Sequence, residues 1–581
     1  MTDPTCLPAT IPPTPEIRLR LWPAVLIVNA HLSISLYTLY FGATNKQSMV
    51  GFIGVPVLAL LLLIVWWLAA SRAPRRDRFA GLLLVAAALL LVFGTQEIRK
   101  PFILLAAIPG TTTAIVAAML ATCWLRWSLQ RWVLAATVIA CAVGFSLLRS
   151  EGLSSSLTPV IAWRWTPTAA ELLKEAPALP SAGTGGTAVL PAQAGPGDWP
   201  AFRGPARDNR VTGVKFSTDW STPPRELWHK RIGVGWSSYI AVGEHIFTQE
   251  QRDQQELVTC SRAATGEEVW VNRAKTHFEN DMGAGPRATP AFDRGRLYTL
   301  GATGTLQCID AATGKTVWTR DIKADAQTGV PGWGFASSPL VVGDKLIVFT
   351  DGGDGKSLIG YDLASGSPAW RAGRGGGGFC SPQLSVLWDT PQVVMASDAG
   401  LQSFVPETGK LLWERVVAKE MNPRCDQPLV ADGNTVLLGS PAGTGARMFQ
   451  IQKKDGAWTA EPTWTSKKFR PYFDDMVFHK GHCYGFDGDR LCCVDAATGE
   501  MRWEGKRLGG QVLLLVDMEM LLVVSEKGEA ILIPATPAGC KEIARFQALS
   551  GKTWNHPVIA HGKLFVRNAE EAACFELPVA R

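Results

Sequence analysis

Charged residues are scarce in this chain of 581 residues, making up 19% of the sequence against about 25% in typical soluble domains. Acidic residues are rarest at the start, where residues 1–150 hold 4 Asp and Glu against 12 Lys and Arg. The rest of the chain holds 47 acidic and 45 basic residues, so it is nearly neutral. This balance argues against nucleic acid as a partner. The hydrophobic content of 47% excludes disorder over most of the chain.

Several motifs of common enzymes are also missing. The sequence has no nucleophile elbow built around a serine and no four-cysteine zinc pattern. The glycine-rich run at residues 373–379 does not follow the strand–helix pattern of a phosphate loop. The 12 cysteines show no spacing that selects disulfide pairs. These absences leave hydrolase, zinc and nucleotide chemistry without support.

Long apolar stretches are concentrated in residues 1–150. A membrane-spanning helix needs about 20 predominantly apolar residues, and most of the stretches are near that length. We therefore predict a helical membrane domain over residues 1–150 with about five spans. The stretches are Leu21–Phe41, Val50–Ala70, Phe79–Gln96, Pro101–Leu125 and Arg131–Leu148.

The basic residues between these stretches predict an orientation. The N-terminus and the second and fourth loops together carry eight arginines, whereas the loops on the other side carry four basic residues, Lys46, Arg99, Lys100 and Arg149. Positively charged loops stay in the cytoplasm. Five spans then place the rest of the chain in the periplasm of a bacterium, anchored in the inner membrane.

A change in composition marks a linker over residues 151–197. Thr168 and Glu171 have the spacing of a capping box and predict a short helix. From Ala176 to Gly197 the sequence is rich in Pro, Gly and Ala, which predicts a flexible tether. Ordered structure is expected to resume at Asp198, so the last domain comprises residues 198–581.

This last domain contains an internal repeat. Strings such as RAATGEEVW and DAATGKTVW recur, and in each the glycine precedes the tryptophan by four residues. The Thr-Gly pair favours a turn, and two apolar runs with alternating pattern precede each turn. The intervals between the glycines are 48, 52, 43 and 90 residues, so the period is about 45. The glycines are Gly266, Gly314, Gly366, Gly409 and Gly499.

Four strands per repeat and this period predict a β-propeller. With degenerate copies included, the sequence accommodates eight blades. The last blade has only three strands of its own, but RELWHKRI at the front of the domain places Trp228 in the repeat's tryptophan position. The fold class is therefore a membrane helical bundle followed by an all-β eight-bladed propeller, closed by a strand from its N-terminal end.

The Asp, Thr-Gly and Trp string resembles the tryptophan-docking repeat of pyrroloquinoline quinone (PQQ) dehydrogenases. It is equally similar to their non-enzymatic relatives, among them the propeller lipoprotein of the outer-membrane β-barrel assembly machinery. The lead-in DWPAFRGPARDN resembles the entry segment of PQQ-like propellers. The resemblance implies the fold and leaves two functions open. One is a binding or assembly scaffold with periplasmic or membrane proteins as partners, and the other is a PQQ- and calcium-dependent dehydrogenase that reduces membrane quinone.

For the dehydrogenase, the resemblance implies a funnel with a catalytic carboxylate, calcium ligands and groups around the quinone. Asp474 is then the catalytic base, and Asp426 and Asn555 bind calcium. The cofactor-binding candidates are Arg424, Tyr472, Trp554 and Arg287. The same residues fit the polar lining of a propeller channel without a cofactor.

Two further observations favour the scaffold. About 44 residues per blade leave little room for the long insertions that cover the cofactor in the dehydrogenases. The neighbouring Cys492 and Cys493 could be read as a vicinal disulfide, but adjacent strand residues face opposite sides. Cys493 also lies six residues before its repeat glycine, as Cys260 and Cys308 do. We therefore expect small buried core residues at these positions. These observations favour a protein that is not an enzyme, and a PQQ-dependent alcohol or sugar dehydrogenase stays the alternative.

Overall fold

The computed structural model describes residues 18–41, 50–96, 103–153, 159–174, 186–417, 424–440 and 444–580. The chain divides into two compact units, Met1–Thr166 and Pro167–Arg581. Lys46, Arg99 and Lys100, which entered the orientation argument, lie outside the described residues, as do residues 176–185 of the expected tether.

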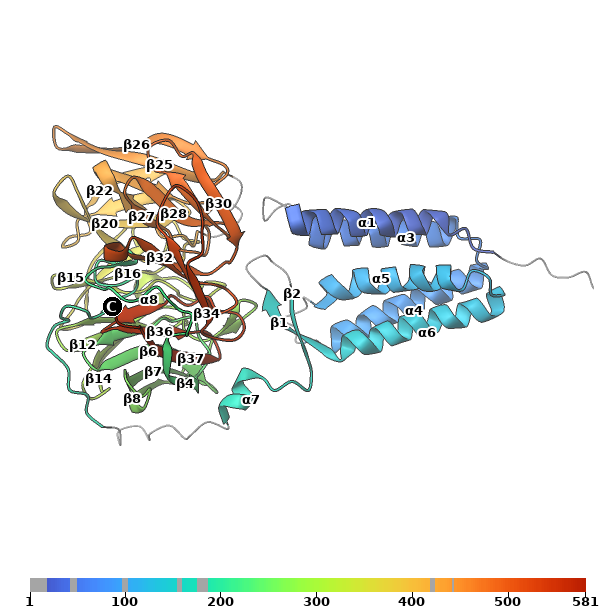
Figure 1. The fold of residues 1–581 in the computed structure, drawn as a ribbon, viewed down its shortest axis with the longest axis horizontal. Helices are drawn as coiled ribbons and strands as arrows, with labels where there is room; N and C mark the ends of the chain where they lie inside the picture. Colours follow the sequence, from blue (N-terminus) through green and yellow to red (C-terminus); the bar gives the residue numbers. More distant parts are fainter. Residues whose placement is uncertain are drawn as a thin grey trace, which may run out of the picture. The chain divides into compact units, whose positions relative to one another are not determined.

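The first unit consists mainly of antiparallel helices (Figure 1). Each of the five apolar stretches forms a helix close to its expected position. Three of them, α4, α5 and α6, are long and apolar enough to cross a membrane, and α3 is a shorter apolar helix. The elements are α1 (Trp22–Phe41), the π-helix η1 (Val50–Gly54), α3 (Val55–Ala69), α4 (Arg75–Gly94), α5 (Leu104–Ala121), α6 (Trp127–Ser146) and the hairpin of β1 (Leu148–Leu153) with β2 (Pro159–Trp163).

The predicted capping box is confirmed at the start of the second unit. The Thr168 backbone N–H donates to Glu171 Oε2 at 2.8 Å, and the Glu171 N–H donates to Thr168 Oγ1 at 3.2 Å. These bonds begin α7 (Ala169–Lys174). The expected tether is wrong for residues 186–197, because the Ala188 N–H donates to the Ala312 carbonyl and the Ala188 side chain is buried among blade residues.

The rest of the second unit is the predicted eight-bladed propeller. Each blade has four antiparallel strands, which follow in sequence order in blades 1 to 7, whereas the outer strand of blade 8 is β4 from the front of the domain. Blade 1 consists of β5 (Ile240–Val242), β6 (His245–Arg252), β7 (Gln255–Arg262) and β8 (Glu268–Ala274), and blade 2 of β11 (Ala291–Asp293), β12 (Arg296–Leu300), β13 (Thr305–Asp310) and β14 (Thr316–Asp321). Blade 3 consists of β15 (Leu340–Val342), β16 (Lys345–Phe349), β17 (Leu358–Asp362) and β18 (Pro368–Ala372), and blade 4 of β19 (Gln383–Leu387), β20 (Thr390–Ser397), β21 (Gly400–Phe404) and β22 (Leu411–Val416).

Blades 5 to 8 follow the same plan. Blade 5 consists of β23 (Leu429–Ala431), β24 (Thr435–Leu438), β25 (Ala446–Lys454) and β26 (Ala457–Ser466), and blade 6 of β27 (Val477–His479), β28 (His482–Asp487), β29 (Arg490–Asp495) and β30 (Met501–Arg507). Blade 7 consists of β31 (Gln511–Leu515), β32 (Met520–Val524), β33 (Glu529–Pro534) and β34 (Ala544–Gln547), and blade 8 of β35 (Val558–Ala560), β36 (Lys563–Arg567), β37 (Glu571–Glu576) and β4 (Arg225–Arg231).

Smaller elements connect or extend the blades. The strand β3 pairs in parallel with β31 of blade 7, and the helix α8 joins blades 2 and 3. The smaller elements are β3 (Arg210–Val211), the hairpin of β9 (Glu279–Asn280) and β10 (Gly283–Ala284), α8 (Ile322–Ala326), and the 3-10 helices η3 (Asp432–Asn434) and η4 (Val516–Met518).

The ring is closed as predicted by β4, which pairs with β37 as the outer strand of blade 8. Trp228 lies opposite Cys574 in this pairing, as Trp270 lies opposite Cys260 in blade 1. A small residue opposite the tryptophan leaves room for the indole. The predicted role of the repeat cysteines as small core residues is confirmed, because all four are buried: Cys260, Cys308, Cys493 and Cys574.

The repeat tryptophan of one blade contacts the repeat turn of the next. The Trp270 indole N–H donates to the Ala311 carbonyl at 3.0 Å. Gly314 lies over the same indole with φ of 71°, and a Cβ on it would come within 2.6 Å of the ring. Glycine is therefore required at this turn for two reasons. Its backbone is left-handed, and a side chain would collide with the neighbouring tryptophan.

Cys492 and Cys493 are both free thiols. Cys493 lies opposite Trp503 and packs in the core that faces blade 7, whereas Cys492 packs with residues of blade 5. The two side chains thus belong to opposite faces of the blade 6 sheet, as the alternation along a strand dictates.

Candidate functional site

The candidate site is the mouth of the propeller channel, where the chain enters the inner strand of each blade. Residues at equal distance before each inner strand occupy equivalent places around the ring. All seven predicted site residues lie in these entry segments, three to five residues ahead of β11, β23, β27 or β35, rather than in the strands themselves. The sequence placed these residues at the starts of the inner strands, and it did not give the partners of their side chains.

A belt of hydrogen bonds joins the entry segments of neighbouring blades. The Ser238 N–H donates to Thr289 Oγ1 at 3.0 Å, and the Thr289 N–H donates to Ser338 Oγ at 2.9 Å. The Ser338 N–H continues the belt to Ser381 Oγ at 2.8 Å. Ser238 Oγ donates to the carbonyl of His556 at 2.6 Å, which connects blade 1 to blade 8. Small hydroxyl residues at one place of the repeat therefore connect the entry segments of blades 1 to 4, and Ser238 adds the link to blade 8.

The three predicted polar residues at the next place before the inner strand also bind backbone groups. Asp426 Oδ2 accepts from the Gly439 N–H at 2.6 Å, and Asp474 Oδ1 accepts from the Gly510 N–H at 3.0 Å. The Asn555 amide donates to the Ser237 carbonyl at 2.8 Å. All three side chains are buried. Each stabilises a connection in its own blade or to the next blade.

The two predicted arginines bind backbone carbonyls as well. Arg424 donates to the carbonyls of Ser397 at 3.0 Å and Gly439 at 2.9 Å. Arg287 donates to Gly285 and Gly283 within its own loop, and its guanidinium lies 4.9 Å from the Phe278 ring. Burial lowers the pKa of Arg287 to about 10.

Aromatic rings form a chain of contacts across the mouth. The centroid of Trp554 lies 5.0 Å from that of Trp236 and 6.1 Å from that of Phe473, with which it is stacked. Phe473 in turn lies 5.9 Å from Trp333, which stacks on Phe379 at 5.1 Å. These five rings come from the entry segments of blades 1, 3, 4, 6 and 8, and each is half-buried.

The two predicted aromatic residues both contact this chain of rings, and Tyr472 is itself buried. The Tyr472 ring centroid lies 3.9 Å from that of Phe473. The Trp554 indole donates to Glu526 Oε1 at 2.8 Å, and Lys552 Nζ lies 4.2 Å from its ring centroid. We call Trp236, Trp333, Phe379, Tyr472, Phe473 and Trp554 the aromatic mouth.

The sequence did not predict that the channel is filled by residues 199–211. This segment contacts inner strands around the ring. Trp199 exchanges two backbone hydrogen bonds with Ala241 of β5, the Phe292 N–H of β11 donates to the Pro200 carbonyl, and the Leu514 N–H of β31 donates to the Asn209 carbonyl. We call residues 199–211 the plug.

Two buried arginines fix the plug in the channel. Arg203 Nε lies 3.3 Å from Asp475 Oδ1, and Arg203 also donates to the Met476 carbonyl at 3.0 Å. Arg207 donates to the carbonyls of Ser338 and Pro339, at 3.1 and 2.9 Å. Arg203 and Arg207 both have positive φ, 64° and 57°, a conformation that non-glycine residues seldom adopt. The signal in the sequence was a pair of arginines spaced by Gly and Pro in a segment expected to be ordered.

Asp474 and Asp475 respond differently to burial although they are adjacent. Burial raises the pKa of Asp474 well above its usual range, with further contributions from Glu526, Asp489 and Asp475. Burial acts in the same direction on Asp475, but His556 and Arg203 outweigh it, and the pKa of Asp475 is lowered. The plug residue Asn209 also donates to Asp475. Burial thus shifts Asp474 toward its neutral form, whereas the ion pairs of Asp475 favour its carboxylate.

The fit of a calcium ion and a quinone can be judged from these contacts. Calcium prefers six to eight oxygen ligands, commonly carboxylates. Asp426 and Asn555 are on blades 5 and 8 and already bind backbone groups, and Asp474 accepts from the Gly510 N–H. Among the described residues, no three His, Cys, Asp or Glu side chains are grouped as metal ligands. In this arrangement the residues do not fit a calcium–quinone pair, and we derive no quinone chemistry from them. The assigned roles stay predictions.

Comparison with known proteins gives one family model. Residues 253–470 match PQQ_2, described as outer membrane protein assembly factor BamB. The protein of that name from Burkholderia pseudomallei is 28% identical over 223 residues, which are 36% of this chain and 52% of the relative. The one from Bordetella pertussis is 25% identical over 205 residues, 33% of this chain and 45% of the relative. The chain spans about half the length of these relatives.

Solved structures of similar fold include a BamB and a quinohemoprotein alcohol dehydrogenase. BamB from Moraxella catarrhalis has a TM-score of 0.45 at 17% identity, covering 61% of this chain and 99% of that chain. The quinohemoprotein alcohol dehydrogenase from Comamonas testosteroni has a TM-score of 0.48 at 12% identity, covering 66% of this chain and 81% of that chain.

Proposed function

Because the chain carries an eight-bladed propeller of the PQQ-repeat kind whose residues 253–470 match the BamB family model, we propose that it is a membrane-anchored scaffold. In this proposal the helical unit holds the chain in the inner membrane, and the propeller binds other proteins in the periplasm. The helices α4, α5 and α6 support the anchor by their length and composition. The name of the relatives, assembly factor, supports a scaffold rather than a catalyst.

The observation that carries the proposal is the combination of the plug and the aromatic mouth. The channel below the mouth contains residues of the chain itself, and the buried polar residues of the entry segments bind backbone groups. What remains for a partner is a surface of half-buried aromatic rings from several blades. Aromatic residues are enriched in protein interfaces and supply most of the hot spots. The mouth is therefore the proposed binding surface for a protein partner.

Site-specific photocrosslinking in intact cells tests this surface. We would replace Trp333, in the aromatic mouth, by the photoreactive residue p-benzoylphenylalanine. The matched control carries the same residue in place of Trp388, which is 45% exposed in the turn between β19 and β20, at the other end of the inner strand. The proposal expects one discrete adduct from position 333 that Trp554→Ala weakens. An adduct equally strong from position 388, or none from position 333, would overturn it.

A second experiment tests the anchor. Alkaline carbonate removes peripheral proteins from membranes and leaves integral ones in place. The proposal expects the full chain in the carbonate pellet, and its C-terminal unit accessible to protease only after the outer membrane is opened. Release of the chain by carbonate would contradict the anchor.

A further inference from the structure

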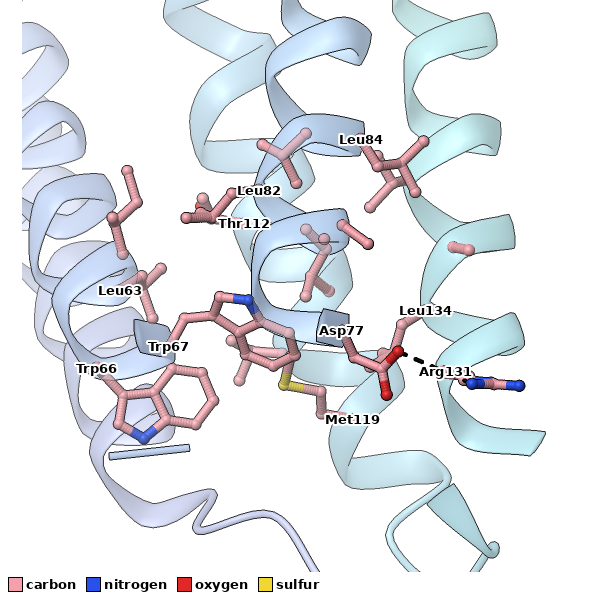
Figure 2. Close-up of a pocket in the computed structure, with 18 of the residues that line it drawn as sticks. Leu63, Trp66, Trp67, Asp77, Leu82, Leu84, Thr112, Met119, Arg131 and Leu134 are labelled. Carbon is pink, nitrogen blue, oxygen red and sulfur yellow. Dashed lines mark ion pairs between the residues drawn. The ribbon is translucent and has the colours of Figure 1, made fainter. Parts of the chain in front are cut away.

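The helical unit contains a cleft that the scaffold function does not use. It has a volume of about 500 Å³ and lies between α3, α4, α5 and α6, within the size range of ligand sites, about 300–1,000 Å³. Figure 2 shows aliphatic side chains and Trp67 along the cleft, with Asp77 and Arg131 pointing toward one another at one end. Its walls are almost entirely apolar and include Leu63, Trp67, Met119, Leu134, Ala135 and Val138.

The polar end of the cleft has a defined structure. Asp77 Oδ2 accepts from the Trp127 indole N–H at 2.6 Å, and Arg131 Nη1 lies 3.8 Å from Asp77 Oδ1. The Arg131 side chain is 45% exposed, so its guanidinium has donors left for a further anion. Trp127 is buried and Asp77 is half-buried. The hydrogen bond to Trp127 holds the Asp77 carboxylate in place, and the carboxylate keeps the Arg131 guanidinium near the cleft.

The helix ends around this polar end are rich in arginine. The end of α3, the start of α4, the end of α5 and the start of α6 lie together, because consecutive antiparallel helices meet at their connections. Arg72, Arg75, Arg76 and Arg126 are exposed in these connections, whereas Asp77 is the one acidic residue of the two connecting segments 70–78 and 122–131. The charge around the polar end is strongly positive.

Tryptophans mark the same level of the helices. Trp66 donates to the Arg20 carbonyl at 3.0 Å, and Trp67 donates to the Arg78 carbonyl at 2.9 Å. Trp124 and Trp132 are exposed. Tryptophan is enriched where the hydrocarbon of a membrane meets its headgroups. An apolar cleft thus begins at the level where indoles and arginines gather.

We propose that this cleft binds an anionic phospholipid, with an acyl chain along Leu63, Met119 and Val138 and the phosphate at Arg131. This inference rests on the proposed membrane anchor. Guanidinium groups bind phosphate oxygens through paired hydrogen bonds, and basic pockets between membrane helices recognise anionic headgroups. A neutral amphiphile satisfies the apolar walls but leaves the surrounding arginines without a counter-ion.

Native mass spectrometry of the full chain in detergent tests the proposal. Phosphatidylglycerol and phosphatidylcholine with identical acyl chains are titrated separately, and the fraction of protein with one bound lipid is measured. We expect phosphatidylglycerol to be retained at higher detergent than phosphatidylcholine. Arg131→Gln is expected to weaken phosphatidylglycerol about fivefold, as loss of one basic residue near an anionic headgroup implies.

The cleft itself is tested by a matched pair of substitutions. Ala135 lines the cleft and Ala136, its neighbour in α6, is exposed and does not. Ala135→Leu is expected to reduce the lipid-bound fraction, and Ala136→Leu, with the same added volume, to preserve it. Equal retention of the two lipids, preference for a neutral prenylated quinone, or equal effects of both leucines would overturn the proposal. Carbonate extraction of the same membranes distinguishes a wrong lipid proposal from a wrong anchor proposal. Carbonate releases the chain only if the helical unit is not an integral anchor.

Discussion

Asp475 and Arg203 form an ion pair inside the propeller channel, with side chains only 5% and 1% exposed and 3.3 Å between Oδ1 and Nε. Arg203 belongs to the plug and Asp475 to the entry segment of blade 6. His556 Nε2, from the entry segment of blade 8, lies 2.5 Å from the other carboxylate oxygen. One carboxylate therefore connects the plug to two blades.

Substitution of this carboxylate should destabilise the propeller strongly. Asp475→Asn leaves Arg203 buried without its anion, and loss of one partner of a buried ion pair costs about 3–5 kcal/mol. Because the pKa of Asp475 is lowered in the folded chain, its stabilising effect is present above the unfolded pKa, about 3.9, and is lost as the pH falls through the folded value. The difference in melting temperature between wild type and Asp475→Asn should thus be large at pH 7 and shrink below about pH 4. A difference that is independent of pH would contradict this role.

Asp474 should show the opposite pH dependence. Its folded pKa is raised by burial, so the neutral form fits the site and the ionised form does not. Its contribution to stability is complete below the unfolded pKa and is lost as the pH rises through the folded pKa. Asp474→Asn keeps an oxygen for the Gly510 N–H and removes the charge. We expect this variant to match wild type near pH 4 and to exceed it in unfolding free energy at pH 8. A variant less stable than wild type at pH 8 would show that the carboxylate is needed there.

The contact between a repeat glycine and the preceding tryptophan can be measured with two glycines of blade 2. Gly314 and Gly295 have nearly the same φ, 71° and 69°, but only a Cβ on Gly314 would meet a neighbour, Trp270 at 2.6 Å. Gly295→Ala should cost about 1–2 kcal/mol for the left-handed backbone alone. Gly314→Ala should cost a further 1–3 kcal/mol or so from overpacking. Denaturant unfolding of both variants measures the difference, and equal costs would mean that the indole moves aside freely.

The enzyme alternative has a direct test. Purified full chain is titrated with PQQ in the presence and absence of Ca²⁺, while cofactor absorbance and melting temperature are followed. We expect no calcium-dependent shift, since Asp426, Asp474 and Asn555 already bind backbone groups. A ligand that binds the folded state at 100 times its Kd stabilises it by about 2.7 kcal/mol, so binding would be visible. A calcium-dependent shift in melting temperature that saturates at one PQQ per chain would support the dehydrogenase hypothesis instead.

Local patterns were enough to predict most of the fold. The helices α1 and α3 to α6 follow from runs of apolar residues, and the eight blades follow from a glycine and a tryptophan repeated at a fixed period. The closing strand β4 was predicted because Trp228 stands where the repeat requires it. The tether was predicted too long, because its composition does not reveal that Ala188 packs on blades 1 and 2.

The position of the candidate residues in the repeat was predictable from the sequence, but their contacts were not. The sequence identified the entry segments, and hence Asp426, Asp474 and Asn555, by their position before the inner strands. It did not predict that all three bind backbone groups, since Gly439, Gly510 and Ser237 come near them only in the folded ring. The sequence identified individual residues of the aromatic mouth. It did not predict that the rings contact one another across five blades.

The sequence by itself determined the repeat, the number of blades and the apolar helices, because each depends on the order of residues over a few tens of positions. Tertiary structure decided what fills the channel and which charges are neutralised there. Arg203 and Asp475 are 272 positions apart, yet their pairing fixes the plug and lowers the pKa of Asp475, whereas burial raises the pKa of its neighbour Asp474. Burial and the distance to opposite charges set these properties, and both arise only when distant segments pack together.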